Sequence, residues 1–251
     1  MKRVCMVICL LSTFLGCSGP AGPRGFMGDR GPDGNRGDIG HGLRGDFELL
    51  EASVFLLKSS YDYNYKILEP NKAGFDTSIP FGLDIFQNEF STQESKDYVY
   101  VALNNDERYI NILKQIIEKL TKPPANSRDK DAAKKLLLAL RDSAECIHQV
   151  INLFLTSSGT VKFVNNDRSF ITELNVFLMM IFRQRKNVVD DIKKILSKVE
   201  PSLTMGNIPN FRNEFKSITE PDGEIYKKIY IGADSLRGLR GIIKNRIDAS
   251  K

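Results

Sequence analysis

Apolar residues recur at helical spacing through most of this chain, and this pattern limits the possible folds more than any other sequence feature. The first stripe consists of Phe47, Leu50, Val54, Leu57 and Tyr61, which share one face of a helix. Comparable stripes follow at 109–120, 136–155, 170–199 and 225–247. Strand-like alternation is almost absent, and only residues 98–103 are ambiguous. The sequence therefore predicts an all-α fold, a bundle of five to six helices over residues 47–251.

Capping residues, prolines and glycines place the helix boundaries. We expect a loop over 70–82 and a short helix over 83–90. The remaining helices are expected between Asn104 or Asn105 and Pro123, Ser127 and Gly159, Asn166 or Asp167 and Pro201, Pro209 and Ile218, and Asp222 and Ile247.

The N-terminus has the features of a secretion signal. Lys2 and Arg3 precede an apolar run over 4–15, which is shorter than the roughly 20 residues that a membrane-spanning helix needs. Gly16 supplies the small residue that a lipoprotein signal peptidase requires before Cys17. We therefore predict a lipoprotein signal peptide over 1–16 and a membrane protein anchored by lipid on Cys17. The alternative is an ordinary signal peptide that happens to contain a cysteine.

This processing also fixes the number of free thiols. Of the four cysteines, Cys5 and Cys9 leave with the signal peptide and Cys17 carries lipid. Cys146 then has no partner for an intramolecular disulfide, although the exported side of the membrane permits disulfides. The helical domain is expected to be held together by burial of apolar side chains.

A disordered, collagen-like tether is predicted over residues 17–46. Glycine recurs at every third position from Gly19 to Gly40, and the frame then slips at Gly42 and Gly45. A Gly-X-Y repeat is typical of collagen, where only glycine fits at the axis of three polyproline II chains. Two interpretations stay open: an extended, unpaired spacer, and a trimeric stalk with charge pairs between its strands.

Two Arg-Gly-Asp triplets lie in the tether, formed by Arg36, Gly37, Asp38, Arg44, Gly45 and Asp46. On an exposed flexible loop this tripeptide can engage integrins. The alternative is coincidence, because the segment is rich in all three residue types.

A basic face is expected on the last helix. Arg237, Arg240 and Lys244 are spaced to lie on one side, and we call these three residues the basic face. It can bind an acidic patch of a host plasma or matrix protein, and glycosaminoglycan and nucleic acid are further polyanionic candidates. The alternative is a solvated helix face balanced by neighbouring acidic residues.

Catalytic and metal-binding patterns are missing from the sequence. Its two histidines are His41, in the tether, and His148, whose spacing from Cys146 points the two side chains to different helix faces. No phosphate-binding loop, paired histidine motif or nucleophile elbow occurs. We therefore expect no enzyme, no metal and no cofactor.

Several segments resemble a known group of bacterial proteins. The lipobox at 14–17, the low-complexity tether and the helical domain resemble the plasmid-encoded surface lipoproteins of Borrelia. Residues 102–109, 112–114 and 190–196 are similar to the helical lipoproteins of relapsing-fever species. The resemblance implies display on the outer membrane and, for many such proteins, binding of host complement, matrix or plasma proteins, but it identifies no binding residue.

Two functional hypotheses follow. The first is a surface-displayed module that binds a host macromolecule or supports immune evasion. The second is a structural or antigenic coat lipoprotein without a defined ligand, trimerised through its collagen-like stalk.

Overall fold

The computed structural model describes residues 39–76, 79–123, 125–155, 167–205 and 212–249. The predicted signal peptide, Cys17, most of the Gly-X-Y tether and the first Arg-Gly-Asp triplet lie outside these residues. By its contacts the chain divides into two compact units, Met1–Ile39 and Gly40–Lys251. The second, which we call the helical unit, carries nearly all of the described structure.

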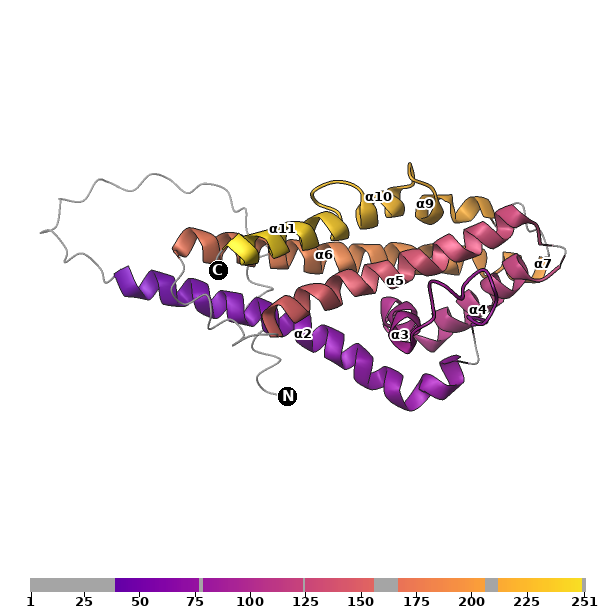
Figure 1. Ribbon diagram of the computed structural model, residues 1–251, viewed down its shortest axis with the longest axis horizontal. Coiled ribbons are helices and arrows are strands. Elements are labelled where there is room, and N and C mark those ends of the chain that lie inside the picture. Colours follow the sequence, from indigo (N-terminus) through magenta and orange to yellow (C-terminus); the bar gives the residue numbers. More distant parts are fainter. Residues whose placement is uncertain (1–38, 77–78, 124, 156–166, 206–211, 250–251) are drawn as a thin grey trace, which may run out of the picture. The chain divides into compact units, whose positions relative to one another are not determined.

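Every regular element in the described residues is a helix, which confirms the all-α prediction (Figure 1). Six helices have ten or more residues: α2 (Ile39–Asp76), α3 (Gln93–Ala102), α4 (Glu107–Thr121), α5 (Ser127–Leu155), α6 (Arg168–Val199) and α11 (Leu236–Ala249). The shorter ones are α7 (Ser202–Met205), α9 (Lys216–Thr219) and α10 (Glu224–Tyr230).

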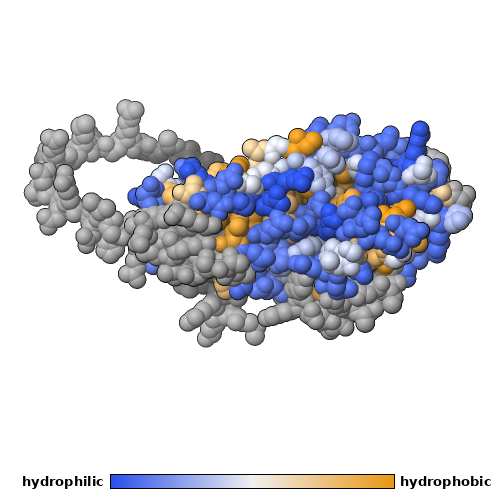
Figure 2. Space-filling model, viewed as in Figure 1, coloured by the Kyte–Doolittle hydropathy of each residue, from blue (hydrophilic) through white to orange (hydrophobic). Residues whose placement is uncertain are grey.

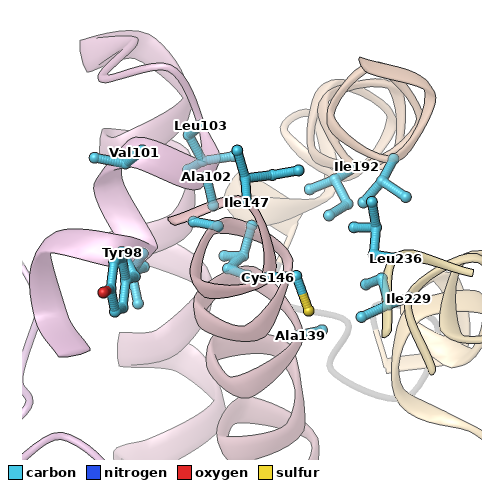
Figure 3. Close-up of a cluster of buried hydrophobic side chains, with 14 of the residues drawn as sticks. Tyr98, Val101, Ala102, Leu103, Ala139, Cys146, Ile147, Ile192, Ile229 and Leu236 are labelled. Atoms are coloured by element: carbon cyan, nitrogen blue, oxygen red, sulfur yellow. The ribbon is translucent and has the colours of Figure 1, made fainter. Parts of the chain in front are cut away.

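Helix α5 is the central element of the helical unit. It packs against α3, α4, α6, α9, α10 and α11. Its buried residues therefore occupy more than one face, and small side chains such as Ala133, Ala139 and Ala144 let neighbouring helices approach closely. Figure 3 shows Ala139, Cys146 and Ile147 of α5 within the apolar cluster that joins these helices.

Helix α2 is longer than the sequence predicted. It begins at Ile39, before the expected domain start at 47, and continues through the predicted loop to Asp76. Ile39 and Leu43 extend the stripe of Phe47 at the same i, i+4 spacing, so the chain turns helical where the Gly-X-Y frame ends. Pro70 lies inside the helix, where a missing N–H and ring clash favour a kink. Figure 1 shows that α2 bends in its last part.

The segment 83–90 forms turns, so the short helix predicted there is wrong. Its backbone hydrogen bonds include Phe86 N to Leu83 O at 2.8 Å and Glu89 N to Phe86 O at 3.0 Å. Phe81, Phe86 and Phe90 are buried, and the rings of Phe81 and Phe90 lie 5.1 Å apart. Burial of these three rings stabilises a compact irregular segment in place of a helix.

The predicted helix over 222–247 is divided into α10 and α11. Gly232 has a φ of +98°, a conformation that glycine adopts readily and other residues rarely do. The turn brings the Gly232 carbonyl against α11, where a Cβ on Gly238 would lie 2.2 Å from that oxygen. The close approach requires glycine at 238, and helical periodicity alone could not reveal it.

The start of α6 is as predicted, and the cap of α5 is not. Asp167 caps α6 by accepting a hydrogen bond from Phe170 N at 2.7 Å. For α5, Asn126 Oδ1 accepts from Asp129 N at 3.1 Å and Asp129 Oδ2 accepts from Asn126 N at 3.2 Å. This reciprocal pair is a capping box, so Asn126 holds the position that the sequence assigned to Ser127.

The ambiguous residues 98–103 form the end of α3 and the turn after it. Tyr98, Val99, Tyr100, Val101 and Ala102 are all buried, as expected for a helix covered on all sides. Among the described helices, none is long and apolar enough to cross a membrane.

Candidate binding face on α5 and α11

The structure places the predicted basic face along one side of α11. Arg237 and Lys244 are exposed, and Arg240 is half-buried. Arg240 Nη1 donates to Gln149 Oε1 of α5 at 2.6 Å, and Lys244 Nζ pairs with Asp248 at 2.8 Å. Among the described residues, Arg237 and Arg240 form no ion pair. Two of the three cations therefore keep their charge available to a partner.

A hollow of about 510 Å³ lies beside these cations, between α5 and α11. We call it the α5–α11 hollow, and it is lined by Gln149, Asn152, Leu153, Arg240, Gly241 and Lys244. No carboxylate belongs to this set. A hollow lined by two cations, two amides and Leu153 suits an acidic segment that also carries an apolar group. The α5 residues were not predicted, because their approach to α11 depends on tertiary packing.

Polar and charged residues make up most of the face of the helical unit seen in Figure 2. The apolar residues of this face lie in small separate patches. The remaining cation of α11 is already engaged, since Arg246 pairs with Glu173 of α6. The basic face is thus a local feature of a mixed-charge surface, in line with the modest net charge of +5.

His148 belongs to a hydrogen-bonded aromatic network between α2, α3 and α5. Its Nδ1 hydrogen-bonds with the Tyr98 hydroxyl and lies 3.4 Å from Glu94 Oε1. Its ring stacks on Tyr61 with centroids 5.3 Å apart, and Nε2 lies 3.2 Å from Asn152 Nδ2. These contacts join α2, α3 and α5. Both ring nitrogens of His148 are engaged with side chains of the protein.

Cys146 lies on another side of α5, as its spacing from His148 predicts. Its sulfur lies on the side toward Leu236 and Ile229 (Figure 3), and the side chain is buried. Burial, the largest influence, raises the pKa of the thiol to about 11. The thiol is therefore neutral at physiological pH, and Cys146 and His148 do not form a nucleophilic pair.

The second Arg-Gly-Asp triplet is part of α2 and not of a loop. The Asp46 side chain is 19% exposed and accepts a hydrogen bond from Arg168 Nε at 2.5 Å. Helical backbone and an occupied carboxylate differ from the exposed flexible loop that integrin binding requires. The triplet of Arg36, Gly37 and Asp38 lies outside the described residues.

Acidic side chains do not gather into a metal site in the described part of the chain. Asp190 and Asp191 diverge on α6, as expected for adjacent helical residues. Asp190 is exposed, whereas Asp191 accepts hydrogen bonds from Lys194 at 3.0 Å and from Lys228 of α10 at 2.9 Å. Asp191 therefore joins α6 to α10.

The fold has a counterpart among solved structures. The outer surface lipoprotein BBA64 of Borrelia burgdorferi matches with a TM-score of 0.57 and 12% sequence identity. The match covers 84% of this chain and 96% of that chain. This chain shares the helical fold of a Borrelia surface lipoprotein. The resemblance in fold agrees with the expectation of a helical domain like those of Borrelia surface lipoproteins.

Sequence comparison adds no further relative. No protein-family model matches the chain, and no curated protein matches its sequence.

Proposed function

We propose that this chain is a lipid-anchored surface lipoprotein of the outer membrane that presents its helical unit to host macromolecules. The observation that carries the proposal is the combination of a lipobox ending at Cys17 with the fold of an outer surface lipoprotein. The Gly-X-Y segment gives this arrangement a spacer between lipid and helices. In polyproline II form a segment of about 30 residues spans roughly 90 Å, and as a coil about 30 Å.

The basic face and the α5–α11 hollow are the proposed contact surface. Arg237 and Arg240 supply charge that no carboxylate of the described residues neutralises, and Leu153 adds an apolar contact inside the hollow. We propose an acidic segment of a host plasma or matrix protein as the partner. Such a contact makes association sensitive to ionic strength, because exposed charges are screened by salt.

Surface display is tested on intact cells that produce the full chain. We expect added protease to remove the protein while a periplasmic control survives, and we expect incorporation of labelled palmitate that Cys17→Ser abolishes. Survival of the protein in intact cells would place it on the periplasmic side. Palmitate labelling that persists in Cys17→Ser would contradict acylation at this residue.

Host binding is tested with the full chain carrying Cys17→Ser, immobilised and exposed to human serum and matrix proteins. We expect one or more proteins to be retained by the native face and lost with Arg237→Glu, Arg240→Glu and Lys244→Glu combined. The matched control reverses three exposed cations elsewhere, Arg128, Lys130 and Lys216, and is expected to retain binding. Equal loss in both variants would indicate a net-charge effect and contradict the proposed face.

The alternative is a coat lipoprotein without a defined ligand. The regular glycine repeat favours it, because a trimeric stalk would array the helical units on the surface. Recovery of no host protein by the native chain, together with confirmed display, would support this alternative.

A further inference from the structure

Arg185 of α6 is a half-buried residue whose guanidinium is enclosed at the end of α3. Its Nη2 donates to the carbonyl oxygen of Val101 at 2.9 Å and lies 3.4 Å from that of Ala102. The last carbonyls of a helix have no partner within the helix and carry partial negative charge. Nη2 therefore caps the C-terminal end of α3, and this nitrogen of the guanidinium has hydrogen-bond acceptors within the protein.

The rest of the guanidinium is not accounted for by this cap. Nη1 is closed off from solvent and has no hydrogen-bond acceptor among the described residues. No described carboxylate pairs with Arg185, and the ionisable group that acts on it is the Tyr61 phenol. Burial lowers the pKa of Arg185 to about 10, so the side chain remains charged at neutral pH. A buried cation without a counter-ion is costly unless an anion compensates it.

Arg185 also lines a cavity of about 210 Å³ between α2, α3, α5 and α6, which we call the Arg185 cavity. Its apolar walls come from Leu57, Val101, Ile147, Phe182 and Val189. The exposed residues Lys186 and Asp190 also line it, so they mark its mouth. With Arg185 and Lys186 against Asp190, the charge of the lining is positive.

We propose that the Arg185 cavity binds a small carboxylate with a short aliphatic tail. The guanidinium that lines the cavity carries a positive charge that no described carboxylate neutralises, and this charge attracts a carboxylate. The apolar walls suit a hydrocarbon tail. The volume lies below the roughly 300 Å³ at which pockets for drug-sized ligands begin, which limits the tail to a few carbons. This site is separate from the α5–α11 hollow and stands independently of the proposed host contact.

The ligand class is tested by calorimetry and thermal unfolding of the full chain carrying Cys17→Ser. The probe is hexanoate, with hexanol to remove the charge, inorganic phosphate to remove the tail, and N-acetyl-leucine to represent a peptide C-terminus. We expect hexanoate to raise the melting temperature in a dose-dependent way and hexanol and phosphate to have little effect. Stronger binding of N-acetyl-leucine than of hexanoate would indicate that the carboxylate belongs to a peptide C-terminus, and it would overturn the assignment to a small aliphatic acid.

The site itself is tested with two variants and a control. Arg185→Met is expected to weaken hexanoate binding at least tenfold, and Arg183→Gln, an exposed change on the same helix, is expected to leave it unchanged. Ser60→Phe places a ring in the cavity and leaves the Arg185 cap of α3 in place, so it is expected to remove hexanoate binding. This variant tests the site independently of Arg185→Met, which can unfold the chain. Absence of hexanoate binding, binding that Ser60→Phe leaves intact, or equal protection by phosphate would overturn the proposal.

Discussion

At the scale of single residues, two glycines of α11 illustrate what sequence periodicity can and cannot show. Gly238 and Gly241 both lie within α11, and both look equally unfavourable for a helix. In the structure a Cβ at 238 would meet the backbone of the preceding turn at 2.2 Å, whereas a Cβ at 241 would meet nothing within 4 Å. One glycine is required by a close backbone approach, and the other leaves open space.

These glycines give a matched pair of substitutions. Gly238→Ala is expected to lower the free energy of unfolding by about 1–3 kcal/mol, because the backbone has to shift to admit a methyl group. Gly241→Ala is expected to raise it by up to about 1 kcal/mol, since alanine favours the helix. Urea unfolding followed by circular dichroism measures both changes. A loss in both variants would contradict the different roles assigned to them.

At the scale of helices, the predictions that held were those with purely local causes. The stop of α4 before Pro123 and the cap of α6 at Asp167 depend on neighbours in sequence, and both are observed. Other features depend on segments that packing brings together, and the sequence did not predict them. These are the break at Gly232, the turns around Phe86 and the hollow beside Arg240. For the same reason the cavity at Arg185 could not be predicted, because its walls come from four helices.

The cap of α5 is tested by Asn126→Ala and Ser127→Ala. Loss of the Asn126 amide removes one half of the capping box and is expected to cost about 1 kcal/mol of stability. Ser127 is exposed and takes no part in that pair, so its substitution is expected to change stability by less than about 0.5 kcal/mol. Denaturant midpoints with unchanged slopes report both values. A larger loss of stability in Ser127→Ala than in Asn126→Ala would indicate that Ser127 is the capping residue.

The contact of Asp191 on α6 with Lys228 on α10 predicts that the free energy of unfolding depends on pH. Partial burial by itself raises the pKa of Asp191, but hydrogen bonds from Lys228 and Lys194 outweigh it and the pKa is lowered. A carboxylate with a lowered pKa contributes stability above its unfolded pKa of about 4, and this is lost as pH falls through the folded value. Asp191→Asn is therefore expected to cost about 1 kcal/mol near pH 7 and progressively less below pH 4.

The adjacent residue supplies the control for this measurement. Asp190 is exposed, and Asp190→Asn is expected to leave stability nearly unchanged over the same pH range. A pH profile of unfolding for the two variants and the native chain separates them. Equal effects of both substitutions would show that Asp191 acts only as surface charge.

At the scale of the whole molecule, the chain combines a helical unit with an N-terminal segment of different composition. The boundary between the compact units, after Ile39, falls where the glycine repeat ends. The helical unit needs no disulfide, since apolar residues from all of its long helices form one buried cluster. The sequence placed the start of the helical region at 47, eight residues after α2 begins at Ile39.

The oligomeric state distinguishes a spacer from a stalk. We expect the chain without its signal peptide, residues 17–251 carrying Cys17→Ser, to be a monomer by light scattering, because a short Gly-X-Y run without hydroxyproline is a weak triple helix. A trimer that dissociates on Gly28→Ala or Gly31→Ala would contradict this prediction and favour the coat alternative. A trimer insensitive to these changes would place the association in the helices and exclude the stalk interpretation of the repeat.

The burial of Cys146 has a practical consequence for such measurements. With the signal peptide removed and Cys17 replaced, Cys146 is the remaining thiol, and its neutral, enclosed sulfur reacts slowly with maleimides. A cysteine introduced at an exposed position such as Asn245 would then be labelled selectively without further mutation. Fluorophore or spin-label pairs placed in this way can report distances across the helical unit in the otherwise native chain.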